Sequence, residues 1–343
     1  MSKQYVKLLV LENFSLLPNE TLEFSSGLNI IVAENACGKS HLLKILYCLL
    51  AVTANEKQRL VKTDLQKAFA DKLTAVFRPD SLGRLVKRQQ GRNRADISLV
   101  LNSGEINRID FSTNSSSQVN IQEIIKEHNN TPAFIPTREL ITLCPWFVPL
   151  YNHNHIPFDE TWYDTCQLLG LPISKGVKEK QIRQLLRPLE EAMGDKIKTD
   201  PAGRFYLGNV ESYLVAEGVR KLMMLARLIS TGSLLDKGYL FWDEPEANLN
   251  PKLIKIIAKI IFELSQSNIQ IFITTHSLFL LRELEILKSN TKNKNTEEFR
   301  YFSLTKNLED EVVLQQTSDF YEIDDLVLLD ENLAQSDRYL MID

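Results

Sequence analysis

The stretch AENACGKS at residues 33–40 joins an apolar run, residues 28–32, to a helical pattern of leucines and isoleucines that starts at Leu42. A Gly-Lys-Ser triplet between a strand and a helix is typical of a loop that holds the phosphates of a nucleotide. Main-chain N–H groups at the start of such a helix attract anions. We therefore predict that Lys39 reaches the β- and γ-phosphates and that Ser40 offers its hydroxyl to Mg²⁺.

Seven residues of this loop are predicted to contact the nucleotide: Asn35, Ala36, Cys37, Gly38, Lys39, Ser40 and His41. Ala33 stands where the usual motif has its first glycine, and alanine disfavours the backbone angles that glycine permits. The alternative is an ordinary strand–helix turn that contains Gly-Lys-Ser by chance. Segments further along the chain decide between these two interpretations.

Two later apolar runs end in polar side chains. Residues 238–246, GYLFWDEPE, indicate a buried strand that delivers two carboxylates at its carboxyl end, where open α/β sheets bind ligands. Asp243 is predicted to hold Mg²⁺, and Glu244 to orient or deprotonate the attacking water. A surface turn that caps a helix is the alternative. Residues 269–277, IQIFITTHS, indicate a second strand, after which His276 is predicted to donate to the γ-phosphate.

In this order and spacing, the three segments resemble an ABC-type ATPase of the RecF, SMC and overcoming-lysogenization-defect group. Residues 243–251 resemble its extended Walker B motif and D-loop, and residues 273–277 resemble its histidine switch. The resemblance implies a signature segment that touches the nucleotide held by the opposite subunit. Residues 214–220 match that segment best, although alanine stands where serine is common. The contacts that this match implies are Ala216, Glu217 and Gly218.

The resemblance implies an α/β fold, namely an ABC-ATPase-like P-loop head with an N-terminal antiparallel sheet and an inserted, mainly helical region. Residues 5–14 and 20–32 are predicted as the first two strands. A short strand at 133–139 would bring Arg138 or Glu139, at its end, near the nucleotide, and no glutamine is identified as the group's Q-loop residue. We expect four parts: an N-terminal lobe with the P-loop at 1–50, a helical or mixed insertion at 51–209, a signature, Walker B and histidine-switch lobe at 210–320, and a tail at 321–343.

Composition limits the possible functions. The net charge of −4 argues against a uniformly basic protein that coats nucleic acid, and no run reaches the roughly 18 apolar residues that cross a bilayer. The four cysteines show no metal-ligand spacing, so we expect a cytoplasmic protein with free thiols and no membrane partner. A basic block between Arg78 and Arg94 is either a solvated loop or a contact to DNA, RNA or a partner protein. Surface solvation is expected for Arg220 and Lys221, and a contribution of either to the site of the opposite subunit is the alternative.

The resemblance also implies that two copies sandwich ATP, because one subunit supplies the P-loop and the other supplies the signature. We expect a two-fold homodimer that uses ATP and Mg²⁺, hydrolyses ATP slowly and controls a separate effector such as a nuclease, in bacterial DNA maintenance or anti-phage defence. The sequence shows no long heptad segment for an SMC-like arm, and no Toprim nuclease domain is expected. Two alternatives stay open: a RecF-like repair ATPase that acts on DNA directly, and a sensor that dimerises on ATP without hydrolysing it.

Overall fold

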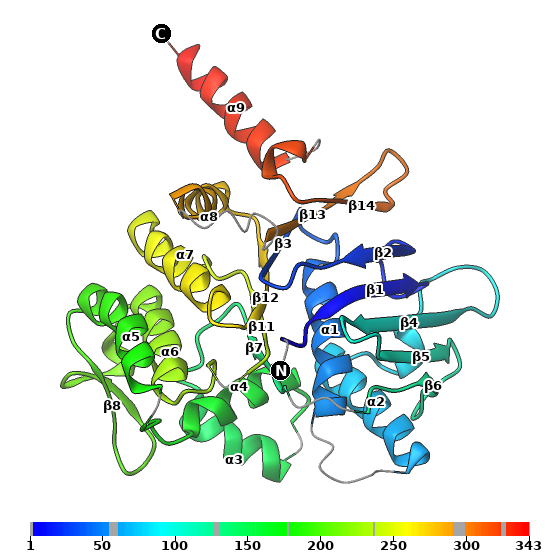
Figure 1. Ribbon diagram of the computed structural model, residues 1–343, viewed down its shortest axis with the longest axis horizontal. Coiled ribbons are helices and arrows are strands. Elements are labelled where there is room, and N and C mark those ends of the chain that lie inside the picture. Colours follow the sequence, from blue (N-terminus) through cyan, green and yellow to red (C-terminus); the bar gives the residue numbers. More distant parts are fainter. Residues whose placement is uncertain are drawn as a thin grey trace.

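A six-stranded sheet forms the centre of the computed structural model, in the order β14-β13-β3-β12-β11-β7 (Figure 1). The structure describes residues 3–54, 61–126, 130–154, 156–176, 178–235, 237–290, 299–323 and 327–342. The strands of this sheet are β3 (Leu28–Ala33), β7 (Pro132–Ile135), β11 (Tyr239–Asp243), β12 (Gln270–Thr275), β13 (Phe299–Lys306) and β14 (Val312–Thr317). All neighbouring pairs are parallel except β13 and β14, which are antiparallel.

Strands β3, β11 and β12 are buried along their whole length. Successive side chains point to opposite faces of a strand, so each strand feeds two hydrophobic clusters. In β11, Leu240 and Trp242 belong to the cluster on the helical side, whereas Tyr239 and Phe241 belong to the cluster that faces the second sheet. Burial on both faces explains why these segments are continuous apolar runs rather than alternating patterns.

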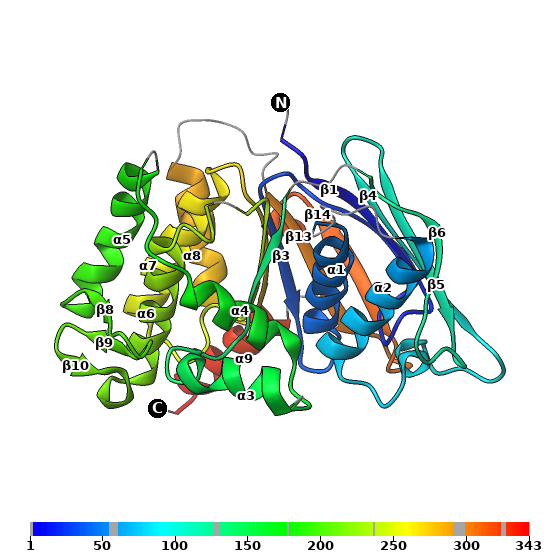
Figure 2. The ribbon, with the colours of Figure 1, turned by 90° about the horizontal axis from the view of Figure 1, so that it is seen from below.

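The second sheet is antiparallel, in the order β2-β1-β4-β5-β6, and helix α1 (Lys39–Ala54) lies between it and the central sheet (Figure 2). Its strands are β1 (Val6–Glu12), β2 (Glu20–Glu23), β4 (Arg94–Leu101), β5 (Ile106–Ser112) and β6 (Asn120–Glu123). The expected insertion at 51–209 therefore contributes strands to both sheets, through β4 to β6 and through β7, in addition to its helices.

The single strand predicted at 20–32 is wrong, because the chain forms β2 and β3 in different sheets. A turn separates the two strands. The side chain of Asn29 accepts a hydrogen bond from the Ser25 N–H (2.9 Å) and donates one to the Ser25 carbonyl (3.0 Å). This side chain satisfies the backbone where the ladder of β2 ends, so the chain can cross from one sheet to the other.

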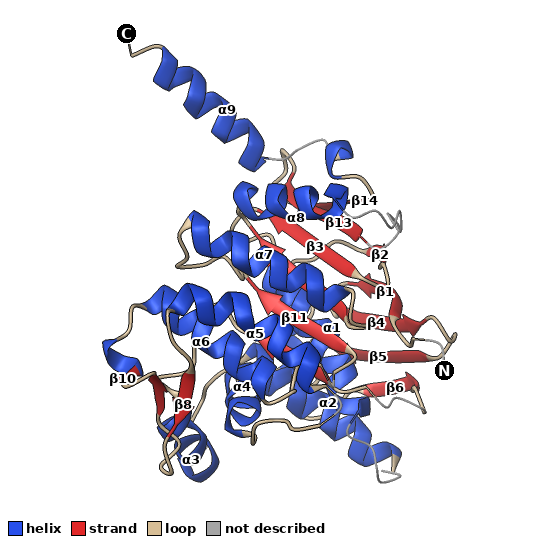
Figure 3. Ribbon diagram, turned by 60° about the vertical axis from the view of Figure 1, so that its left-hand side comes forward, coloured by secondary structure: helices blue, strands red, loops and turns tan. Residues whose placement is uncertain are grey.

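Helices cover the remaining face of the central sheet, and α9 extends away from the body (Figure 3). The helices besides α1 are α2 (Lys62–Phe77), α3 (Cys144–Asn154), α4 (Glu160–Gly170), α5 (Glu179–Met193), α6 (Glu217–Ser230), α7 (Pro251–Ser265), α8 (Leu278–Asn290) and α9 (Val327–Leu340). Smaller elements are the 3₁₀ turns η1 (Leu82–Leu85), η2 (Ser212–Leu214) and η4 (Phe320–Glu322), and a sheet of β8 (Ile197–Thr199), β9 (Phe205–Leu207) and β10 (Val210–Glu211). Within the described ranges, no helix has the length and apolar character needed to span a membrane.

Candidate nucleotide-binding site

Four parallel strands, β3, β12, β11 and β7, end at the same edge of the central sheet. Their pairing register places Val32 opposite Thr275, Asp243 opposite Thr274, and Ile135 opposite Trp242. The residues that follow these strands come from segments far apart in the sequence, yet they meet along one rim. This is the edge at which parallel α/β sheets bind ligands.

The loop after β3 winds tightly into α1. The Leu42 N–H donates to the carbonyl of Gly38 at 3.0 Å, so the helix begins within the Gly-Lys-Ser triplet. Ala33 ends β3 without a positive φ, and the missing glycine therefore causes no strain at that position. The left-handed residues are instead Ala36 (φ 64°) and Gly38 (φ 90°), of which the alanine costs roughly 1–2 kcal/mol.

The predicted phosphate and metal ligands lie in direct contact. Lys39 Nζ is 2.9 Å from Glu244 Oε1, and the Ser40 hydroxyl donates to Asp243 Oδ2 at 2.8 Å. The Thr274 hydroxyl donates to the other oxygen of Asp243 at 2.5 Å and thereby orients that carboxylate. The structure thus brings together four residues that the sequence assigned to one site.

His276 joins the same cluster through two carboxylates. Its Nδ1 lies 3.3 Å from Glu244 Oε1 and 3.8 Å from Glu246 Oε1. Glu246 is nearly buried and accepts bonds from the Thr275 hydroxyl (2.6 Å) and from the His276 N–H (3.1 Å). Sequence reasoning did not assign Glu246 a role, although it is the last residue of the Asp-Glu-Pro-Glu quartet. Its carboxylate fixes the histidine loop to the Walker B segment.

Glu244 is held in an uncommon conformation and in a charged environment. Its φ of 48° is left-handed, and its N–H donates to the Thr274 hydroxyl at 3.0 Å. Burial raises the pKa of this carboxyl group, but the Lys39 ammonium and the His276 ring outweigh burial, and the net pKa is lowered. Glu244 is therefore ionised at neutral pH and is paired with the lysine that is predicted to bind phosphate.

Lys221 and Arg220 are not the solvated side chains that the sequence predicts. Lys221 is only 2% exposed, and its ammonium donates to the carbonyls of Glu244 (2.9 Å) and Ala247 (3.2 Å). Burial lowers its pKa from 10.5 to about 8, against the opposing effect of nearby carboxylates. Arg220 Nε lies 2.7 Å from Glu139 Oε1. The first turns of α6 lie against the sheet edge, so both cations face that edge. This contact joins distant segments of the chain, and no local sequence pattern shows it.

The predicted signature residues lie at the start of α6, beside the D-loop. The Asn248 amide donates to Glu217 Oε1 at 2.9 Å, and a Cβ added to Gly218 would approach the Asn248 carbonyl to 2.9 Å. Ala216 occupies the N-cap position without a capping side-chain bond. Among the described residues, no hydrogen bond or ion pair joins Ala216, Glu217 or Gly218 to Lys39 or Ser40. Their contact with the nucleotide of an opposite subunit stays a prediction.

Two residues of the P-loop are engaged in other contacts. His41 Nδ1 lies 2.6 Å from the Ser15 hydroxyl, and burial lowers the pKa of His41 to about 4. The ring is therefore neutral at neutral pH, and it can offer phosphate at most one N–H and no positive charge. Cys37 is fully buried, and burial, followed by the charge of Glu34, raises the pKa of its thiol.

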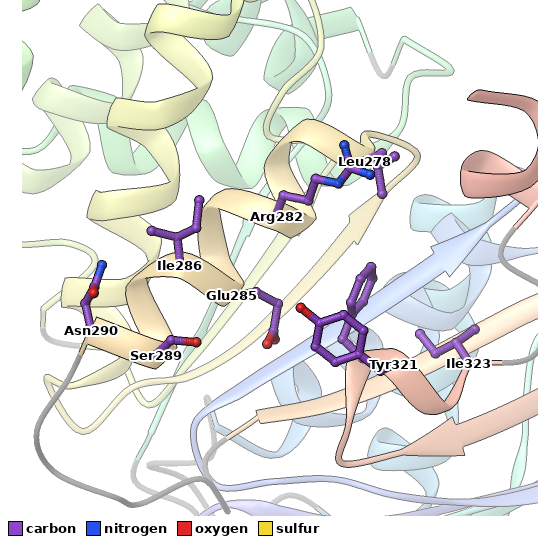
Figure 4. Close-up of a pocket in the computed structure, with 9 residues that line it drawn as sticks. Leu278, Arg282, Glu285, Ile286, Ser289, Asn290, Tyr321 and Ile323 are labelled. Atoms are coloured by element: carbon purple, nitrogen blue, oxygen red, sulfur yellow. The ribbon is translucent and has the colours of Figure 1, made fainter. Parts of the chain in front are cut away.

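Among the hollows on the described surface, two are relevant to the site. One of about 530 Å³ lies between α8 and η4 and is lined by Arg282, Glu285, Ile286 and Tyr321, among others (Figure 4). It is separate from the phosphate loop. The other, of about 440 Å³, includes Ala36 of the P-loop and is lined by basic and acidic side chains: Arg84, Lys87, Arg88, Lys306, Asp310 and Glu311.

The residues at the rim fit Mg²⁺ in combination with phosphate. Magnesium prefers a few oxygen ligands from the protein and takes the remainder from phosphates and water. Ser40 and Asp243 offer two such oxygens in contact with each other. In the part of the chain that the structure describes, no three His, Cys, Asp or Glu side chains gather as a self-sufficient metal site. The donor set therefore suits a metal that arrives with a nucleotide.

Comparisons with known proteins agree with this geometry. A family model described as "AAA domain, putative AbiEii toxin, Type IV TA system" matches residues 28–282. The DNA replication and repair protein RecF of Clostridium acetobutylicum is 37% identical over 68 residues, which is 19% of this chain and 19% of that protein. The matched segment thus spans about a fifth of this curated relative.

Solved structures of SMC heads share the fold. The SMC head bound to the C-terminal winged-helix domain of ScpA superposes with a TM-score of 0.54 at 13% identity, covering 94% of this chain and 100% of that one. The SMC head with an extended coiled coil, bound to the C-terminal domain of ScpA from Pyrococcus furiosus, superposes with a TM-score of 0.54 at 12% identity. The match covers 98% of this chain and 99% of that one. The chain therefore belongs to the matched AAA-domain family, and it is an ABC-type ATPase of the RecF/SMC group.

Proposed function

We propose that the protein is an ATP-hydrolysing switch subunit that dimerises around ATP and controls a separate effector, such as a nuclease, in bacterial DNA maintenance or anti-phage defence. The observation that carries the catalytic part is the convergence of Lys39, Ser40, Asp243 and Glu244 on one rim. The family's description as a putative toxin of a type IV toxin–antitoxin system supports a role in defence. The similarity to RecF supports a role in DNA maintenance.

The contacts at the rim indicate how the site responds to ATP. The triphosphate competes with Glu244 for Lys39, because both are anions that pair with the same ammonium. Once Lys39 binds phosphate, Glu244 is free to orient the attacking water and to accept its proton. His276 lies 3.3 Å from Glu244 and donates to the γ-phosphate. Ser40 and Asp243 are the residues that would hold Mg²⁺, which neutralises phosphate charge when bound.

The signature residues Ala216, Glu217 and Gly218 complete the site from the opposite subunit, so that two copies enclose two nucleotides. A shift from mostly open to mostly closed dimers needs about 5 kcal/mol of differential affinity, which charged phosphate contacts supply. Turnover is slow, because Ala216 lacks the hydroxyl that serine would offer to the phosphate. Gly218 and the start of α6 still provide main-chain donors.

Replacement of Glu244 by glutamine tests the hydrolytic role. Glu244→Gln keeps the shape of the side chain but cannot accept a proton, so phosphate release should fall about 100-fold or more while ATP and the dimer persist. Phosphate release and sedimentation are measured with Mg²⁺ and ATP. The matched control is Glu263→Gln on α7, which lies away from the rim and should turn over like the wild type. Equal turnover in Glu244→Gln would refute the role, and wild-type dimers without turnover would favour the sensor.

One observation favours direct action on DNA as a second candidate. Arg84, Lys87 and Arg88 line the hollow beside Ala36, so a cluster of cations lies next to the nucleotide rim. A phosphate backbone bound there would give an affinity that falls steeply with salt. Charge reversal of Arg84, Arg88 and Arg92 should then strongly weaken binding to a DNA duplex and flatten the salt dependence of the binding that remains. Charge reversal of two exposed arginines on α5, Arg183 and Arg187, is the control.

A further inference from the structure

The loop that follows β7 leaves the sheet beside the Walker B segment. Strand β7 lies beside β11 (Figure 1). Ile135 pairs with Trp242 in parallel register, so Pro136 and the residues after it continue from the same edge as Asp243. β7 is the outermost strand on this side of the sheet, and β11 is its neighbour. Residues 136–139 therefore border the nucleotide rim.

Both ends of this loop are fixed. Pro136 and Leu140 are buried, and the Glu139 side chain is only 5% exposed. The Glu139 carboxylate pairs with Arg220 Nε at 2.7 Å and accepts a bond from the Thr142 hydroxyl at 3.1 Å. Arg220 belongs to α6, which begins at the predicted signature. The backbone at Arg138 is thus anchored on one side to the sheet and on the other to the signature helix.

Arg138 itself is exposed, and the structure gives it no hydrogen bond or ion pair with any other described residue. Other cations nearby are engaged: Lys39 with Glu244, Arg220 with Glu139, and Lys221 with two carbonyls. A guanidinium that is positioned but unpaired is available for an anionic ligand. Its planar set of N–H donors matches two phosphate oxygens at once.

We propose that Arg138 binds the γ-phosphate of a nucleotide held on its own P-loop and makes the site select triphosphate over diphosphate. This inference rests on the proposed ATP site and names a ligand of that site. Glu139 is a positioning residue in this arrangement, because it ties the arginine loop to α6. Binding of the γ-phosphate to Arg138 is thereby coupled to the position of the signature helix α6, because the Glu139–Arg220 ion pair joins the two segments.

Calorimetry with Mg²⁺ and either a non-hydrolysable ATP analogue or ADP tests this proposal. Arg138→Ala should lower the affinity for the analogue about 10- to 100-fold and change the affinity for ADP by no more than about twofold, because only the analogue has a γ-phosphate. Arg138→Lys should lie between this variant and the wild type, since lysine keeps the charge but loses the two-pronged contact. Arg187→Ala, which removes an exposed arginine on α5, is the matched control and should bind both nucleotides normally.

Three outcomes separate the inference from the function on which it rests. Unchanged affinities in Arg138→Ala, or equal losses for the two nucleotides, would overturn the role of Arg138. Lys39→Ala should lose both nucleotides; if it binds them like the wild type, the proposed ATP site fails as well. Thermal unfolding without nucleotide should be nearly the same in Arg138→Ala and the wild type, because the exposed side chain makes no hydrogen bond or ion pair within the described part of the fold.

Discussion

The buried ammonium of Lys221 gives the protein a pH dependence that can be calculated. Its pKa is about 8 in the folded chain and 10.5 without burial, a difference of about 2.5. At 1.36 kcal/mol per pKa unit, the charged form costs the native state about 3 kcal/mol below pH 8. The folded state releases the proton first, so this cost disappears as the pH rises from about 8 to 10.5, and stability increases.

Lys221→Met isolates this contribution, because methionine has a similar length and no charge. Between pH 7 and 9.5, the unfolding free energy of the wild type should rise by about 2 kcal/mol relative to the variant. Urea unfolding at both pH values, followed by fluorescence, measures the difference. Lys259→Met, which alters a half-exposed lysine on α7, is the control and should show no such trend.

If the unfolding free energy of the wild type relative to Lys221→Met stays constant as the pH rises, or falls, the assignment of Lys221 as a buried, charged donor is refuted. The variant should also impair turnover, because the Glu244 and Ala247 carbonyls lose their donor and the Walker B turn loses its tie to α6. If turnover is unchanged while the pH dependence appears, burial of Lys221 is confirmed, but its influence on the site is refuted.

Three further predictions follow from single contacts. Gly218→Val should abolish ATP-dependent dimers in sedimentation while each chain still binds ATP, because its Cβ would lie 2.9 Å from the Asn248 carbonyl; normal dimers would contradict this. Glu246→Gln should slow single-turnover hydrolysis by about tenfold without loss of ATP binding, since the amide weakens its bonds from Thr275 and His276, and an unchanged rate would argue against this role. Cys37 should be alkylated slowly in the native protein, as followed in peptide mass spectra, and its rapid labelling would contradict its burial.

The site was largely predictable because its parts are local. The Gly-Lys-Ser triplet, the two acids after an apolar run and the histidine after the next run each have a recognisable sequence context. Their order along the chain then predicts that they meet, since parallel strands deliver their carboxyl ends to one edge. The contacts of Lys39 with Glu244 and of Ser40 with Asp243 have this origin.

The remaining features depend on contacts between distant segments. The sequence around Lys221 is typical of an exposed lysine on a helix. Only the packing of α6 against the Walker B turn shows that Lys221 is buried. Glu139 and Arg220 are separated by most of the helical region, so no spacing rule pairs them. Ser26-Gly27 marks a turn between β2 and β3, but only the bonds between Asn29 and Ser25 show that the chain changes sheets there.

Calorimetry of ATP with and without Mg²⁺, on the wild type and on Asp243→Asn, tests the proposed site most directly. We predict one nucleotide per chain, bound more tightly with Mg²⁺ in the wild type, and loss of most of that metal dependence in the variant, because Asp243 contacts Ser40 at the P-loop. Absence of ATP binding by the wild type, or the same Mg²⁺ dependence in both proteins, would contradict a single site built from the three strand ends.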